Sequence, residues 1–270
     1  MRLFCLILAL TIFASCEKNN TKHDTITLQF RPRVSSDILA LSSKITYKTY
    51  ADGIAATIEY LSGGEVVKPT DYVISLYSGD NFIDTLKASP NFEKISTYIM
   101  MGENILNQAE GLAPSIPALE NELKMDYQRY VEVQNSELFY KEGSGVGGAP
   151  PKLMAYRTTG VKDFAITSTS NLFGAAPGTS LNNYFSIRSL IPAQVINYET
   201  KQLAWGYTDN IPLTNLSQWL SLKPTAQPLM FLQLNSEPPV VPDGEIDFIV
   251  SMTLENDTVL RDTISARFIQ

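Results

Sequence analysis

Cysteine and histidine are almost absent from this chain. Its 270 residues include two cysteines, Cys5 and Cys16, and one histidine, His23. Serine and cysteine nucleophiles need a positioned base, which is usually histidine, and zinc sites are built from clusters of cysteine and histidine. The sequence beyond residue 25 therefore excludes thiol chemistry, imidazole catalysis and the usual zinc sites.

We accordingly expect a protein that is not an enzyme and that carries no cofactor or metal. A serine–lysine pair would need no histidine, but the chain has no S-x-x-K motif with its accompanying pieces. A hydrolase built on paired carboxylates is the catalytic alternative that this composition leaves open.

Basic residues are also in short supply. The chain has 21 Lys and Arg against 28 Asp and Glu, a net charge of −7. Because there is no excess of cations to displace counterions from phosphates, we expect no nucleic acid partner. The acidic residues are spread along the chain, which is typical of a soluble surface and not of a site.

Long apolar runs are missing as well. The longest covers residues 3–14, interrupted only by Thr11, whereas a membrane-spanning helix needs roughly 20 apolar residues. Arg2 stands before this run and small residues follow it, which is the pattern of a secretory signal. We therefore expect residues 1–15 to be a signal peptide.

The end of this signal resembles the lipobox of bacterial lipoproteins. Ala14 and Ser15 directly precede Cys16, and Phe13 stands where leucine is usual. The resemblance implies cleavage before Cys16 and a diacylglyceryl group on its sulfur, with acyl chains such as palmitate holding the protein to the outer membrane. An ordinary signal peptide is the alternative.

The polar residues 16–25 predict a tether between lipid and domain. Surface-exported lipoproteins tend to carry an acidic cluster after the cysteine, but here Lys18 follows Glu17 at once. Whether the domain faces the periplasm or the cell exterior therefore stays open.

Alternation of apolar and polar residues dominates the rest of the chain. It is clearest at 246–254 and 260–268, which flank the turn residues Asn256 and Asp257 and predict a β-hairpin with one buried face. Further strands are predicted at 26–30, 45–50, 54–61, 72–78, 82–87, 95–100, 127–133, 161–168 and 229–234. Many short strands between turn signals favour an all-β fold, an antiparallel β-sandwich.

Helical patterns are scarce. Short helices are predicted after Ser115, with a proline in the first turn, and over residues 214–222. Both are expected to lie in connections between strands.

The glycine-rich segment 142–151 is the predicted domain boundary. It separates a β-sandwich-like lobe at 26–141 from a second β-sandwich lobe at 152–270, although it could equally be a long loop inside one large domain. Gly143, Gly145 and Gly148 match the dinucleotide pattern G-x-G-x-x-G, but two prolines follow and no strand–helix unit surrounds them, so we interpret the segment as a linker.

Two groups of candidate binding residues also have simpler structural interpretations. Trp205, Tyr207 and Trp219 could stack on a sugar, but aromatic residues in strands more often form the core. The acidic turn residues at 243–247 and 80–84 could bind calcium, but neither segment matches the twelve-residue calcium loop, and a solvated turn is the simpler interpretation.

The tripeptide Asp-Thr-aliphatic occurs four times. It looks like the O-glycosylation sequence that Bacteroides-type bacteria use on exported proteins, and composition alone predicts about one match. The candidate modified residues are Thr25, Thr85, Thr258 and Thr263. Thr25, in the tether, is the strongest candidate.

Two resemblances cover parts of the mature chain. The stretches 153–156, 161–168, 178–185 and 231–268 resemble a family of Bacteroidota lipoproteins with a domain of unknown function. The stretch 102–110, GENILNQAE, is similar to fimbrillin-type accessory lipoproteins. Both resemblances imply β-rich, lipid-anchored, non-catalytic envelope proteins, and neither supplies a catalytic residue.

The sequence thus predicts an outer-membrane lipoprotein with a binding or assembly role. The membrane is its partner through Cys16, and a protein or glycan ligand is expected at loops at the ends of the sandwich. The alternatives are a fimbrial or adhesin-type subunit that adds strands at a sheet edge, and a glycan-binding or glycan-degrading accessory protein.

Overall fold

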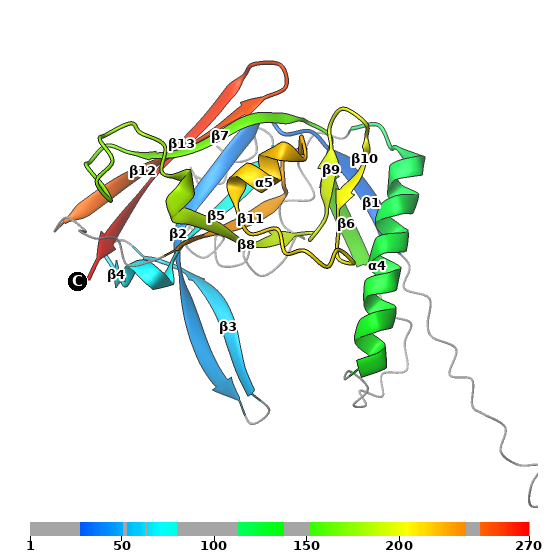
Figure 1. The fold of residues 1–270 in the computed structure, drawn as a ribbon, viewed down its shortest axis with the longest axis horizontal. Helices are drawn as coiled ribbons and strands as arrows, with labels where there is room; N and C mark the ends of the chain where they lie inside the picture. Colours follow the sequence, from blue (N-terminus) through cyan, green and yellow to red (C-terminus); the bar gives the residue numbers. More distant parts are fainter. Residues whose placement is uncertain are drawn as a thin grey trace, which may run out of the picture.

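The structure is a computed structural model that describes residues 28–50, 53–62, 64–79, 113–137, 152–235 and 244–269. It consists mainly of strands, and its two principal sheets pack face to face as a sandwich (Figure 1). The predicted all-β, antiparallel sandwich class is therefore confirmed. Predicted strands 82–87 and 95–100 lie outside the described residues, as do Cys16, Thr25 and Thr85.

The larger sheet has five antiparallel strands in the order β3-β2-β5-β11-β8. Their bounds are β2 (Asp37–Tyr50), β3 (Gly53–Tyr60), β5 (Tyr72–Gly79), β8 (Phe185–Ile191) and β11 (Leu229–Leu234). The long strand β2 pairs with β5 along one edge, from Asp37 to Lys44. It pairs with β3 along its other edge, from Ser43 to Tyr50. Beyond the end of β5, β2 and β3 continue as a projecting hairpin (Figure 1).

The smaller sheet has the order β4-β13-β12-β7. Its strands are β4 (Val66–Val67), β7 (Val161–Ser168), β12 (Glu245–Leu254) and β13 (Val259–Phe268). The predicted hairpin is confirmed as β12 and β13, which pair from Glu245↔Arg267 to Thr253↔Val259. Along β12 every second side chain is buried, as its alternation predicts.

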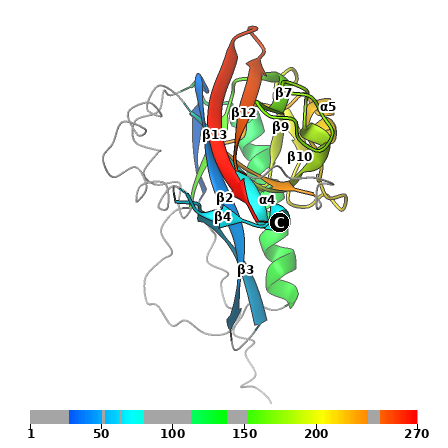
Figure 2. The same ribbon diagram turned by 90° about the vertical axis from the view of Figure 1, so that its left-hand side faces the viewer.

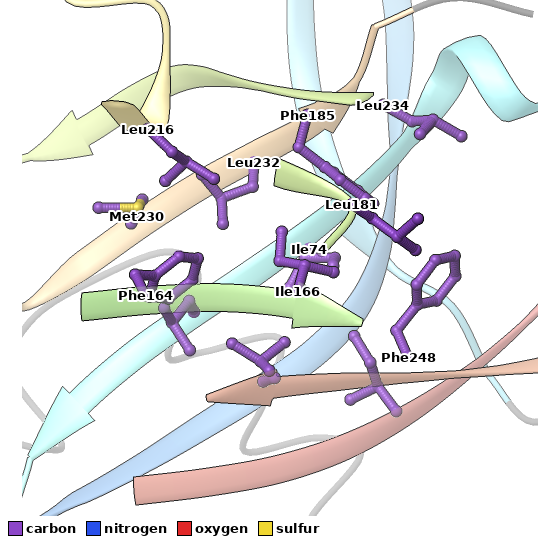
Figure 3. Close-up of a cluster of buried hydrophobic side chains, with 14 of the residues drawn as sticks. Ile74, Phe164, Ile166, Leu181, Phe185, Leu216, Met230, Leu232, Leu234 and Phe248 are labelled. Carbon is purple, nitrogen blue, oxygen red and sulfur yellow. The ribbon is translucent and has the colours of Figure 1, made fainter. Parts of the chain in front are cut away.

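The main hydrophobic core lies between these two sheets. Figure 3 shows Ile74 and Leu232 of the larger sheet meeting Ile166 and Phe248 of the smaller one. The short helix α5 (Leu216–Ser221) closes one end of the core with the fully buried Trp219. α5 matches the predicted helix at 214–222, and its N-cap Asn215 accepts a hydrogen bond from the Gln218 N–H at 2.7 Å.

A smaller layer lies beside the sandwich. It comprises the parallel pair β1 (Leu28–Arg33) and β6 (Lys152–Arg157), the pair β9 (Val195–Asn197) and β10 (Gln202–Trp205), and helix α4 (Pro117–Glu137). Short 3-10 turns stand at Pro69–Asp71 and Asn182–Tyr184.

Helix α4 corrects one prediction. Residues 127–133 were predicted as a strand, but they belong to this 21-residue helix, which begins near the predicted Ser115 signal. Leu119, Leu123 and Tyr127 follow each other at four-residue intervals and are buried against β6 and β9 side chains. Docking of this helical face outweighs the strand preference of the local aromatic and β-branched residues.

The sheets do not follow the predicted division into two lobes at 142–151. β5 from before this segment pairs with β11 from after it, β1 pairs with β6, and β4 pairs with β13. Strands from both sides of the predicted boundary thus share single sheets and one core.

Candidate binding site at the seam between β2 and β13

A hollow of about 350 Å³ opens where the edges of the two sheets meet. Residues 39–42 of β2 line one side and residues 262–267 of β13 line the other. Figure 2 shows these two strands running beside each other along the side of the sandwich. We call the contact between them the seam.

The pattern of lining residues shows which chemical groups the strands expose in this hollow. Successive side chains of a strand point to opposite faces, so a surface lined by side chains includes every second residue. Here the lining residues are consecutive on both strands. The backbone edges of β2 and β13 therefore form much of the wall, and they present peptide N–H and C=O groups.

On the sides that face each other, no described strand pairs with residues 39–41 of β2 or 262–266 of β13, whereas the Ser42 carbonyl already accepts the Leu61 N–H at 2.9 Å. β3 pairs with β2 only from Ser43 onward, and β4 pairs with β13 only at Arg267 and Phe268. Between these limits, the seam is bridged by side chains in place of a backbone ladder.

Side chains of Asp262 and Ser42 carry hydrogen bonds across the seam. The Ala40 N–H donates to Asp262 Oδ2 at 2.8 Å, and Ser42 Oγ donates to the Ser265 carbonyl at 2.7 Å. The other carboxylate oxygen of Asp262 accepts from the Thr263 N–H at 3.0 Å. Ser42 Oγ also lies 3.0 Å from the hydroxyl of Tyr72, a side chain whose pKa is raised by burial.

The sequence contains a signal for this site that the hairpin prediction passed over. Leu260, Ile264, Ala266 and Phe268 occupy the core side of β13 with Asp262 in the middle of the series. A carboxylate at a core-side position needs hydrogen-bond partners. The break in the alternation marks the point where β13 meets β2, although it does not identify β2 as the partner.

The chain between β3 and β4 forms a further wall of the hollow. Leu61 is buried in the main core, its N–H donates to the Ser42 carbonyl at 2.9 Å, and Ser62, Gly64 and Glu65 follow at the rim. Gly64 has a φ of 85°, a conformation that glycine adopts without strain. This turn leads the chain from β3 into β4.

Ion pairs stand at the rim of the hollow. Lys44 contacts Glu65, and Arg267 Nη2 lies 3.3 Å from Glu245 Oε2. The hydrogen bond from Lys44 holds the pKa of Glu65 below its usual range, helped by the positive charge of Lys44 and by Ser62, and opposed by partial burial. The rim carboxylates are therefore already paired with cations.

Thr258 and Thr263, the two candidate glycosylation residues within the described ranges, are both exposed. Thr258 lies in the turn between β12 and β13, and Thr263 lies on β13 at the hollow. Exposure is compatible with modification, which stays a prediction, as does lipidation of Cys16.

The aromatic residues considered for sugar stacking have structural contacts. Trp219 is fully buried and meets the Phe164 ring edge to face. Trp205 packs against the main core and donates from Nε1 to the Ile211 carbonyl at 2.9 Å. The Tyr207 ring contacts Tyr127 and Tyr130 of α4. These contacts match the core interpretation of the aromatic residues.

A buried carboxylate holds α4 against the loop after β10. Asp126 is 5% exposed and accepts hydrogen bonds from Gln194 Nε2, the Tyr207 N–H, the Thr208 N–H and the Thr208 hydroxyl, at 2.7 to 3.1 Å. A Cβ on Gly206 would lie 2.4 Å from its Oδ2. Sequence reasoning missed this cluster because Asp126 directly precedes the segment 127–133 that was predicted as a strand, and its partners Gln194, Tyr207 and Thr208 are at least 68 residues away along the chain.

Within the described ranges, no group of three or more Cys, His, Asp or Glu side chains is placed to hold a metal ion. At the predicted acidic turn, Glu245 pairs with Arg267 and Asp247 Oδ1 accepts from the Ser265 hydroxyl. No helix in the described part of the chain is long and apolar enough to span a bilayer.

Comparison with protein-family models, with curated proteins and with solved structures finds no match to this chain.

Proposed function

We propose that this chain is an outer-membrane lipoprotein that presents a non-catalytic β-sandwich for binding or assembly in the cell envelope. Cys16 carries the lipid, residues 16–25 are the tether, and the sandwich is the rigid platform. The observation that supports a binding role best is the hollow between β2 and β13, whose walls are strand edges.

The chemistry of the hollow favours binding over catalysis. A catalytic carboxylate has to be available to the substrate. At the rim, Glu65 is engaged by Lys44 and Glu245 by Arg267, and Asp262 accepts two backbone N–H groups. What the hollow offers instead is backbone and small hydroxyl groups.

Membrane attachment is tested by fractionating cells that produce Cys16→Ala or the unchanged chain. We expect the unchanged chain in the outer-membrane fraction and the variant in the soluble fraction. Equal retention of both in the membrane fraction would contradict a lipid anchor on Cys16.

The binding role is tested in the envelope itself. Photo-crosslinking residues are placed at exposed positions across the sandwich, such as Ser62, Gln218 and Asn256. We expect one or a few discrete cross-linked species whose yield depends on position. Uniform background at every position would argue against a stable partner.

A fimbrial or adhesin-type subunit that works by strand addition is the second candidate. It is favoured by the edge of β13 that faces away from β12, which has a ladder partner among the described strands only at Arg267 and Phe268. The nine paired positions of β12 and β13 commit this hairpin to its own sheet, so β13 would receive a strand and not be donated. Binding of the full chain to a glycan array would instead support the glycan-binding alternative.

A further inference from the structure

We propose that the seam binds an extended segment of a partner polypeptide, which pairs with the edge of β13 between Asp262 and Ala266. The inference rests on the proposed binding role and names the ligand class. An extended peptide is the ligand that pairs with a strand edge, because its own N–H and C=O groups form backbone hydrogen bonds with that edge. The consecutive lining residues of both strands present that kind of surface.

The chain itself shows that this edge accepts a strand. β4 pairs with β13 in parallel at Val66↔Arg267 and Val67↔Phe268, and the Ile269 N–H continues the pairing to the Val67 carbonyl at 3.0 Å. The hollow begins where this short strand stops. A bound peptide would continue along β13 the pairing that β4 makes at its end.

The two bonds that cross the seam are the ones a peptide would replace. A peptide C=O would accept from the Ala40 N–H in place of Asp262, and a peptide N–H would donate to the Ser265 carbonyl in place of Ser42. Because a side chain bridges the gap at each point, the strands stand further apart than ladder neighbours, whose spacing is about 4.8 Å. Insertion parts them further, so the seam bonds compete with the peptide.

The rim gives little preference for the charge of the partner. Glu65 and Glu245 line the hollow already paired with Lys44 and Arg267, and Asp262 accepts two backbone N–H groups. A pairing strand has to supply N–H groups, so the partner segment contains no proline at the positions that pair with β13.

The test uses a phage-displayed library of random 12-residue peptides selected on the full-length chain, followed by synthesis of the enriched peptides with a fluorophore. Thr263→Trp places a bulky side chain at the hollow, and Thr258→Trp is its matched control, because both threonines are exposed on the same hairpin and follow an aspartate. We expect at least a tenfold loss of peptide affinity in Thr263→Trp and none in Thr258→Trp.

Two further measurements keep the proposal open to refutation if Thr263→Trp disturbs the fold. Ser42→Ala removes one seam bond and should tighten peptide binding several-fold. Peptides with N-methyl groups on alternate residues lose the donors needed for a ladder and should lose binding to the unchanged chain.

The proposal is overturned if no peptide is enriched, if the selected peptides bind Thr263→Trp as tightly as Thr258→Trp, or if N-methylation at either set of alternate positions leaves affinity unchanged. Discrete cross-links from positions away from the seam, with no peptide binding at the seam, would leave the proposed function standing and remove this inference alone.

Discussion

Single polar residues hold parts of this molecule in place. Asp126 accepts four hydrogen bonds from Gln194, Tyr207 and Thr208, and these bonds fix the position of α4. Asp262 does the same for two strand edges. Asp126 is buried and Asp262 is partly buried, and a carboxylate withdrawn from water is unfavourable unless it is hydrogen-bonded, so each residue depends on its partners.

Replacing Asp126 by asparagine should lower the free energy of unfolding by about 2 kcal/mol, because an amide nitrogen then faces donors that the carboxylate had satisfied. Urea denaturation of the full chain measures the change. Glu132→Gln, on an exposed position of the same helix, is the control and should change stability by less than about 0.5 kcal/mol. A loss of equal size in both variants would argue against a role for the buried cluster.

At the scale of elements, the local sequence pattern predicted the secondary structure correctly where a strand has one buried face and one face in water. The alternation of β12 and β13 predicted their type and their buried face, because every second residue is buried. The same reasoning failed at 127–133, where Tyr127, Tyr130 and Val131 suit a strand locally but share one face of α4. Helix period and strand period are hard to separate over a few residues.

Lys44 on β2 and Glu65 before β4 form an ion pair that joins two elements at the rim of the hollow. Since the pKa of Glu65 is lower in the folded state, its contribution to stability is complete above the ordinary glutamate value of about 4.3 and is lost as the pH falls through the lower, folded value. The unchanged chain should therefore lose more stability on acidification than Glu65→Gln does.

Urea midpoints of both proteins at pH 7 and below pH 4 measure this difference. The midpoint of the unchanged chain should be the higher at pH 7, and the gap should narrow in acid. The effect is small because the pair is partly exposed and solvent screens it. A gap that is constant with pH would show that Glu65 contributes through something other than its charge.

At the scale of the whole molecule, the two sides of 142–151 depend on each other. β5 lies between β2 and β11 in the larger sheet, and the main core draws buried side chains from both sides of that segment. In the ranges that the structure describes, neither part alone contributes all the strands of the sandwich. Sheets with missing strands leave unpaired edges and exposed apolar faces.

A protease site inserted within 142–151 tests this dependence. After cleavage of the folded chain, we expect the two parts to elute together on size exclusion and to unfold in one cooperative transition. The same parts produced separately should not unfold cooperatively. Separation after cleavage, with each part unfolding cooperatively by itself, would restore the two-lobe organisation.

The amino-acid sequence by itself determined the fold class, most of the strands, the β12–β13 hairpin and helix α5, because each depends on the period of burial over a few neighbouring residues. Only the tertiary structure decided which strands meet. Ala40 and Asp262 are 222 residues apart along the chain, and Ser42 and Ser265 are 223 apart. No local pattern records such a pairing, because two facing backbone edges are chosen by the packing of both sheets around their common core.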